Sequence, residues 1–425
     1  MKTGPFGTLL KASEYSEIDG VPVISVGEVR EGYFRLTEHT PLVPESVQRR
    51  LSQYLLKAGD VVFGRKGAVD RSALVRQPQA GWFLGSDGIA VRPSAEHCPE
   101  YVAAQFQSFK VRQWLASNST GTTMASMNQG VLSRVAIPFP PTIAEERSIA
   151  EVLNDADALI DSLEQLLTKK RQVKQGAMQE LLTGKRRLPG FQQSWSEVRL
   201  GSVGRTYGGL TGKGKADFGH GASKYITFMN VMTTVRTSTE MVESVEVGPS
   251  ESQNMVQPGD LLFNGSSETP EEVALCSWVE SCDEGVFLNS FCFGFRPFDS
   301  DRLSGLFMAY FFRGRPGRAA VSSLAQGATR YNIAKTALLQ APLCLPAFAE
   351  QQAIAEVLSS MDTEIAALES RLTKARALKQ AMAQALLTGR IRIPLGPQEP
   401  AVPVPPPEGV GALRSGPARA QEPSA

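Results

Sequence analysis

Side chains that can hydrogen-bond to the edges of nucleic-acid bases are concentrated in a few short loops of this chain. Each loop adjoins a segment with strand composition, so a rigid backbone would hold the side chains in place. Polar residues presented in this way read base edges in DNA. The candidate DNA-binding residues are Arg65, Lys66, Arg71, Thr122, Thr123, Ser126, Asn128 and Gln129 in the first half, and Lys213, Lys215, Asn264, Ser266, Ser267, Arg330, Tyr331, Asn332 and Lys335 in the second. For each single residue, a solvated loop position is the alternative.

Motifs that would give the chain catalytic chemistry of its own are incomplete. The segment GLTGKGKA (209–216) has the spacing of a phosphate-binding loop, but Ala216 replaces the Ser or Thr that would hold magnesium. The NPP(F/Y) or DPP(F/Y) element of amino-methyltransferases is missing, and the acidic residues of 268–284 lack the spacing of a metal-dependent nuclease. Five cysteines without CxxC spacing and three scattered histidines support neither a metal site nor a disulfide framework. We therefore expect no catalytic residue on this chain.

The sequence that must position the loops is duplicated. Residues 141–184 recur as 346–389 at a constant offset of 205, with roughly half of the paired residues identical. Apolar residues at alternating steps of three and four predict one long helix in each copy, and each helix is the obvious packing partner of the other. We call the line of predicted packing residues the seam. Its residues are Ile149, Leu153, Ile160, Leu163, Leu167 and Leu181, and Ile354, Leu358, Ile365, Leu368, Leu372 and Leu386.

Signals at the helix ends and inside the seam support this reading. Thr142 and Glu145 predict a capping box at the start of the first helix, while Gly184 and Gly389 predict the two stops. Lys174 and Lys379 interrupt the seam at equivalent positions. A charge in a seam lowers stability but can fix register or orientation.

The remaining sequence divides into two globular regions with many short predicted strands and the same element order. Strand-like segments at 21–29, 59–67, 71–76 and 88–93 of the first are echoed by 225–231, 258–265, 272–279 and 291–297 of the second. We therefore predict an α+β protein in which a module of globular domain plus long helix occurs twice. The Pro-rich stretch from 390 to 425 is predicted to be disordered.

Composition narrows the class of protein. With 42% hydrophobic and 20% charged residues, no run of eighteen apolar residues and no secretory apolar core, the chain is expected to be cytoplasmic, without membrane contact. The net charge of +1 argues against a protein that grips DNA alone through bulk charge. Basic residues would have to be concentrated on one face, or a partner would have to share the phosphate contacts.

Several motifs carry a resemblance to a known family. They are GDVVFGRKG and PGDLLFNG, GTTMASMN and GATRYNI, and IPFPPTIAEERSIAEVL and LCLPAFAEQQAIAEVL with their LLTG endings. With these, the chain resembles the specificity (S) subunit of type I restriction-modification enzymes. The resemblance implies target recognition domains at 1–140 and 195–345, long antiparallel coiled-coil helices at 141–184 and 346–389, and a linker at 185–194. The first domain departs from the pattern of the second, with only about twenty residues before VPVIS, and a misassigned start and a truncated domain both stay open as explanations.

The same resemblance implies how the chain would work. Each recognition domain would read one half of a bipartite asymmetric site in double-stranded DNA. The helices would set the spacer and dock two methyltransferase subunits, which the restriction subunits join. S-adenosylmethionine, ATP and magnesium would then bind to partner subunits, with no cofactor on this chain. Two other classes stay open: a stand-alone DNA methyltransferase or nuclease, and a duplicated coiled-coil adaptor that does not bind DNA.

Overall fold

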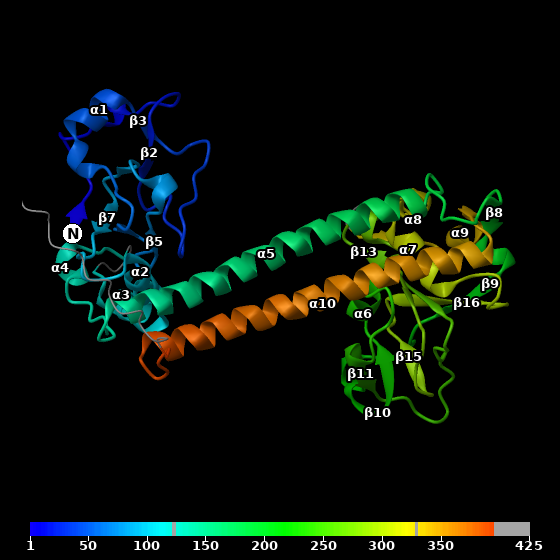
Figure 1. Cartoon of the computed structure of the whole chain (residues 1–425). Helices are drawn as coiled ribbons and strands as arrows, with labels where there is room; N and C mark the ends of the chain where they lie inside the picture. Colours follow the sequence, from blue (N-terminus) through cyan, green and yellow to red (C-terminus); the bar gives the residue numbers. More distant parts are fainter. Residues whose placement is uncertain (121–124, 328–329, 395–425) are drawn as a thin grey trace, which may run out of the picture. The chain divides into compact units, whose positions relative to one another are not determined.

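The computed structural model describes residues 1–120, 125–327 and 330–394. The chain divides into two compact units, the first formed by Met1–Asp157 with the residues from Ala377 onward, and the second by Ala158–Arg376. Two long helices, α5 (Ile143–Leu181) and α10 (Phe348–Leu387), contribute residues to both units (Figure 1). The predicted α+β class with two long helices is confirmed.

The globular part of the first unit contains two small sheets. Four antiparallel strands have the order β1-β7-β4-β5, and three more have the order β3-β2-β6, in which β2 and β6 run parallel. The strands are β1 (Lys2–Thr3), β2 (Val21–Ile24), β3 (Leu42–Val43), β4 (Val61–Gly64), β5 (Ser72–Leu74), β6 (Phe83–Leu84) and β7 (Gly88–Val91). The helices are α1 (Glu45–Arg50), α2 (Pro99–Gln107), α3 (Phe109–Asn118) and α4 (Gln129–Leu132). Helices α2 and α3 are separated at Ser108, whose extended backbone and side chain cap α3.

The second unit repeats this plan. Its strand orders β9-β16-β12-β14 and β11-β10-β15 match the two sheets of the first unit, with β10 and β15 again parallel. These strands are β9 (Gly204–Gly208), β10 (Phe218–Ile226), β11 (Val242–Val245), β12 (Leu261–Asn264), β14 (Cys276–Trp278), β15 (Val286–Leu288) and β16 (Cys292–Pro297). Two further pairs are β13 (Ser266–Ser267) with β17 (Tyr331–Asn332), and β8 (Ser196–Arg199) with β18 (Pro342–Leu345). The helices are α6 (Phe228–Thr233), α7 (Gly305–Arg313), α8 (Arg315–Ser322) and α9 (Lys335–Gln340).

One ion pair between a buried aspartate and a partly exposed arginine occupies the same place in both globular parts. Arg92 donates to both carboxylate oxygens of Asp60, at 2.6 and 2.7 Å, and Arg296 does the same to Asp260, at 2.8 and 2.7 Å. Each aspartate also accepts a backbone N–H at the turn before the central strand, which explains the GD dipeptide in both copies. Bidentate pairs of this kind fix geometry as well as charge. The central strands β4 and β12 therefore leave their turns in the same way.

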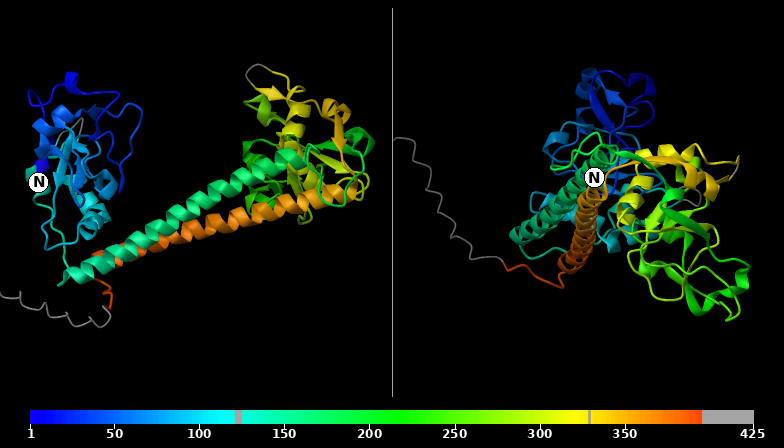
Figure 2. Two further views of the ribbon diagram at one scale, coloured as in Figure 1. Left: turned by 45° about the horizontal axis from the view of Figure 1, so that its top comes forward. Right: turned by 90° about the vertical axis from the view of Figure 1, so that its right-hand side faces the viewer.

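In the second unit α5 and α10 run antiparallel. Three ion pairs join the helices: Glu164 with Arg376, Arg171 with Glu369, and Lys174 with Asp362. The residue number rises along α5 while that of the partner on α10 falls, as it does in an antiparallel pair. Between the helices lies a cluster of four buried leucines, with Ile160, Ile365 and Ala375 half-buried around it; the leucines are Leu163, Leu167, Leu368 and Leu372. Both views of Figure 2 show the two helices side by side here.

The ends of the predicted helix seam take part in the globular cores. In the second unit Leu181, Ile354 and Leu358 pack with residues of α7 in the largest buried cluster. In the first unit Ile149, Leu153 and Leu386 pack with Tyr101 of α2. The apolar stripe of each helix therefore stabilises two contacts in turn, one with a globular domain and one with the other helix.

The capping box predicted for α5 forms only in part. The hydroxyl of Thr142 accepts the N–H of Glu145 at 3.3 Å, but the Glu145 carboxylate pairs with Arg392. The equivalent pair, Glu350 with Arg187, has two bonds of 2.6 Å in the second unit. A charged partner in bidentate geometry is a stronger donor than a backbone N–H, which accounts for the difference.

Candidate nucleic-acid interface

In the first unit the structure brings together the two predicted loops. Lys66, in the turn after β4, forms an isolated bridge with Ser126. The N–H of Gly67 donates to the Ala125 carbonyl at 2.7 Å, and that of Met127 donates to the Arg65 carbonyl at 2.8 Å. Backbone hydrogen bonds thus hold both loops in one surface.

The side chains of this surface differ in how freely they can act. Lys66 is exposed but pairs with Asp87 at 3.0 Å, and Arg71 is exposed. Asn128 caps α4 by accepting the N–H of Val131 at 2.9 Å. Exposed Gln129, the first residue of α4, donates to the hydroxyl of Thr3 at 2.9 Å. Thr122 and Thr123 lie outside the described residues.

The second unit builds the same arrangement from different residues. Strand β13 follows β12 and pairs with β17, while the N–H of Ile333 donates to the Gly265 carbonyl at 3.2 Å. Arg330, Asn332 and Lys335 are exposed here, and Tyr331 is half-buried. Two loops far apart in the sequence therefore meet beside the central strand in each unit.

Three predicted contact residues of the second unit have a supporting role instead. Asn264 is 0% exposed, and its amide bonds Ser266, Glu272 and Leu275 of the adjoining backbone. The side chains of Ser266 and Ser267 are also buried, and Ser267 donates to Glu272 at 2.9 Å. This corrects the expectation that these residues face DNA. Their hydrogen-bonding groups are used inside the protein, where an unsatisfied group would be costly.

The loop containing Lys213 and Lys215 belongs to another part of the second unit. It precedes β10, which belongs to a different sheet from β13 and β17 and lies apart from β13 in Figure 1. Lys213 pairs with Glu251 at 2.6 Å, and its hydrogen bond lowers the pKa of that carboxyl to about 2. Only 5% of the Lys213 side chain is exposed, so its charge is neutralised within the protein. Lys215 is exposed in the following turn, Lys215–Asp217.

Phe291 is a surface residue that the polar pattern of the loops did not reveal. It precedes β16, is 55% exposed, and has the guanidinium carbon of Arg330 at 5.2 Å from its ring centroid. Its carbonyl accepts the N–H of Gly265 at 2.8 Å, as the carbonyl of Asp87 accepts that of Arg65 at 2.7 Å. Asp87 and Phe291 are therefore equivalent positions. The available signal was a phenylalanine placed directly after the turn-type pair Asn289-Ser290 and directly before a strand-like segment.

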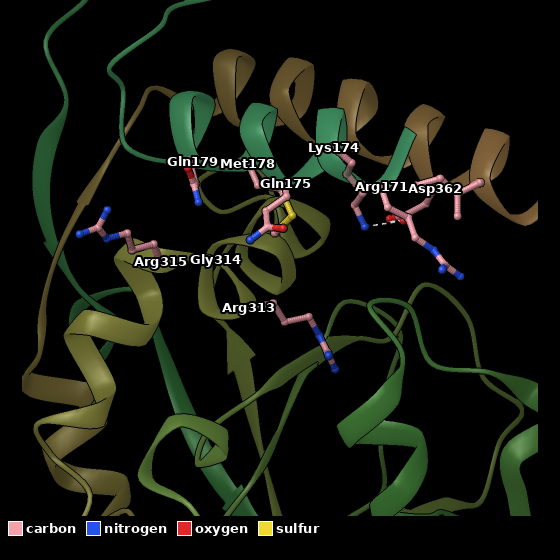
Figure 3. A pocket seen from close by; sticks show the side chains of 10 residues that line it. Arg171, Lys174, Gln175, Met178, Gln179, Arg313, Gly314, Arg315 and Asp362 are labelled. Carbon is pink, nitrogen blue, oxygen red and sulfur yellow. Dashed lines mark hydrogen bonds and ion pairs between the residues drawn. The ribbon is translucent and has the colours of Figure 1, made fainter. Parts of the chain in front are cut away.

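A second candidate site is a hollow of about 450 Å³ in the second unit, between α5 and the junction of α7 with α8 (Figure 3). Basic groups line it, but Lys174 pairs with Asp362, and Arg171 pairs with Glu369 at 2.6 Å. Arg313 donates to four backbone carbonyl oxygens, and burial lowers its pKa. These three basic side chains are thus already bonded within the protein. The groups of the hollow that can still bond a ligand include the exposed amides of Gln175 and Gln179.

Two further searches of the described residues found no site. No group of three or more His, Cys, Asp or Glu side chains there is arranged to hold a metal ion. Among the same residues, no helix is long and apolar enough to span a membrane.

Comparison with known proteins places the chain in a family. The model of the type I restriction modification DNA specificity domain matches it twice, over residues 6–175 and 193–375. The chain is 23% identical over 351 residues to the type I restriction enzyme MjaVIII specificity subunit of Methanocaldococcus jannaschii, covering 79% of this chain and 77% of that protein. It is 21% identical over 410 residues to the putative MjaX specificity subunit of the same organism, covering 90% of each. Its fold resembles the crystal structure of the S subunit of a type I restriction-modification system from M. genitalium, with a TM-score of 0.52, 12% identity and coverage of 91% and 92%. The chain belongs to the type I restriction modification DNA specificity family.

Proposed function

We propose that this chain is the non-catalytic subunit that gives a type I restriction-modification complex its DNA sequence specificity. The proposed target recognition domains, 1–140 and 195–345, each read one half of a bipartite asymmetric site. The observation that carries this proposal is a common framework bearing unlike side chains. At equivalent positions of the two loop surfaces, the first unit has Asp87 where the second has Phe291, and Gln129 where the second has Lys335. Two surfaces of one geometry and different chemistry suit two different half-sites.

The distribution of charge supports a reader that works within a complex. Arg65, Arg71, Arg330 and Lys335 carry positive charge at the two surfaces, while the whole chain has a net charge of only +1. Affinity for DNA depends mainly on the number of phosphates neutralised. A few local cations position the chain on DNA, and the partner subunits supply the remaining phosphate contacts.

The long helices are the proposed docking site for two methyltransferase subunits. Six exposed residues of α5 recur unchanged at the equivalent exposed positions of α10, although about half of the paired helix residues differ, and three of the six are uncharged. These three are Thr168, Gln175 and Gln179, with Thr373, Gln380 and Gln384. Steps of seven and four place the three on one face of each helix. Packing between the helices does not require particular residues at exposed positions. The presence of the same residues on both helices therefore favours two copies of one partner.

The remaining parts of the proposal concern the assembly. Restriction subunits join through the complex, and S-adenosylmethionine, ATP and magnesium bind to the partner subunits. The helices set the length of the unread spacer between the half-sites. The two other candidate classes, a stand-alone enzyme and an adaptor that does not touch DNA, lack a comparable supporting observation.

The test is to express the chain with the methyltransferase encoded beside it and to map methylated adenines across the host genome. We expect one bipartite motif from the complex and no methyl transfer from the purified chain alone. Methyl transfer by the chain alone would favour the enzyme, and a complex that selects no motif would favour the adaptor.

Docking is tested separately with Q175K/Q179K and the matched variant Q380K/Q384K. Each pair of lysines places charge on one of two equivalent faces, so each variant should retain one bound methyltransferase and lose the other. Mass photometry of the assembled complexes measures this directly. Two bound copies in both variants would refute the assignment of this face.

A further inference from the structure

Phe291 is an exposed aromatic ring on a fixed backbone. Its N–H donates to the Asn289 side-chain oxygen at 2.9 Å, and its carbonyl accepts from Gly265 at 2.8 Å. These bonds tie it to the turn 289–292 on one side and to the loop after β12 on the other. Because 55% of the residue is exposed, the ring is held out in solvent. Such pre-organisation lowers the entropic cost of binding to a partner.

The neighbours of the ring are those of the candidate interface. Gly265 leads into β13, which pairs with β17, and Arg330 directly precedes β17. The Arg330 guanidinium, 5.2 Å from the ring centroid, covers part of the ring. Arg330 forms no ion pair with a carboxylate among the residues that the structure describes. An apolar ring and a free cation therefore stand together beside the proposed reading loops.

The same framework position in the first unit has opposite chemistry. Asp87 occupies it and pairs with Lys66 at 3.0 Å. The exposed ring near Arg65 in the first unit, Phe6, comes from a different position of the chain. The backbone bond that holds the position is kept, at 2.7 Å against 2.8 Å. A position whose backbone is retained while its side chain changes from carboxylate to phenyl is suited to setting specificity.

We propose, building on the proposed function, that Phe291 is a specificity-determining residue that contacts the methyl group of a thymine in the second half-site. The major-groove edges of the bases carry hydrogen-bonding groups, and the thymine methyl is their apolar feature. An exposed phenyl ring beside a guanidinium group matches that feature. Arg330 is a positioning residue that holds the ring against the DNA and meets a neighbouring phosphate.

The experiment uses the complex of the full chain with its methyltransferase subunits on a duplex carrying the mapped site. Each thymine of the second half-site is replaced in turn by deoxyuridine, which removes only the methyl group. At one position we expect binding by the wild-type complex to weaken about five- to tenfold, in line with the contribution of one base contact. The variant F291A should bind the thymine duplex about tenfold more weakly and lose the difference between thymine and uracil.

Phe298 supplies a matched control. It is 67% exposed and lies at the other end of β16 from Phe291, about 23 Å away along the strand. We expect F298A to keep the wild-type affinity and the wild-type preference for thymine, with the same melting temperature as F291A.

Three results would overturn the inference. The first is an F291A complex with unchanged affinity and an unchanged thymine preference. The second is a wild-type complex that tolerates uracil at every position of the second half-site, which would show that the ring acts in another way. The third is an equal loss in F298A, which would mark a general effect of surface aromatics. A wild-type complex that selects no DNA sequence at all would instead refute the proposed function.

Discussion

Two equivalent lysines of the helix pair lie in different surroundings, and this difference predicts unequal energies. Lys174 pairs with Asp362 in the second unit, and Lys379 pairs with Asp157 in the first. The exposed fraction of the side chain is 19% for Lys174 and 38% for Asp362. It is 32% for Lys379 and 50% for Asp157. Tyr310 also donates to Asp362, at 2.6 Å. The pair in the second unit is therefore better shielded and better bonded.

The magnitude follows from this shielding. Opposite charges 4 Å apart attract by about 4 kcal/mol at the effective dielectric near a protein surface, and by about 1 kcal/mol in bulk water. Desolvation and lost side-chain freedom offset most of this gain. We expect a coupling free energy of about 1.5 kcal/mol for Lys174 with Asp362. For Lys379 with Asp157 we expect less than about 0.5 kcal/mol, the usual range of an exposed pair.

Two double-mutant cycles measure these energies. One uses K174M, D362N and the double variant, and the other uses K379M, D157N and the double variant. Methionine keeps the length and apolar character of the lysine stem, so each change mainly removes charge. Urea unfolding followed by circular dichroism, with hydrogen exchange along α5 and α10 to separate the units, gives the coupling free energy. Equal couplings, or a larger one for Lys379, would refute the link between shielding and strength.

Three further predictions concern recognition, spacing and pH. Replacing residues 195–345 with those of a relative should change one half of the methylated motif; a methylome in which both halves change would contradict two independent readers. Deleting the matched heptads 164–170 and 369–375 should alter the spacer length or abolish assembly, since the seam loses two turns from both helices; methylation of the original site would exclude a role in spacing. The Arg392 hydrogen bond lowers the pKa of Glu145, so this pair stabilises the fold above the usual carboxyl pKa, and its contribution is lost as pH falls through the lowered value. The free energy of unfolding of E145Q should therefore depend less on pH below about pH 5 than that of wild type. The matched variant E151Q, at an exposed position, should keep the wild-type pH dependence. Identical acid-unfolding curves for E145Q and wild type would contradict this.

The helices could be predicted from the sequence because their signals are local and occur twice. The steps of three and four, repeated at an offset of 205, located both helices to within a few residues of their ends. Gly184 and Gly389, the predicted stops, have φ angles of 69° and 71°, a left-handed conformation that favours glycine after a helix. Prediction succeeded where neighbouring residues determine the structure.

The contact residues were harder to predict because their exposure depends on distant segments. Ser266 follows a turn-like pattern, yet it lies in β13, which pairs with β17 more than sixty positions away. Asn264 is buried at the end of β12, where it pairs with Cys292 of β16. The partner of Glu145 is likewise 247 residues distant, so the local capping pattern suggested a different bond. Phe291 is apolar, so the pattern of polar loop residues did not include it. Burial of this kind is a tertiary property that composition alone does not encode.

The two globular parts separate what is retained from what has changed. The pairs Asp60 with Arg92 and Asp260 with Arg296 hold the turns before the central strands in the same geometry, and equivalent backbone bonds join the reading loops. Above this common backbone, Asp87 and Phe291 present unlike groups. Because side chains can change there without moving the backbone, a new half-site can be acquired by substitution within one domain. Under the proposed function, the other domain and the proposed docking faces of the helices would then stay unchanged, which is the physical advantage of a duplicated reader.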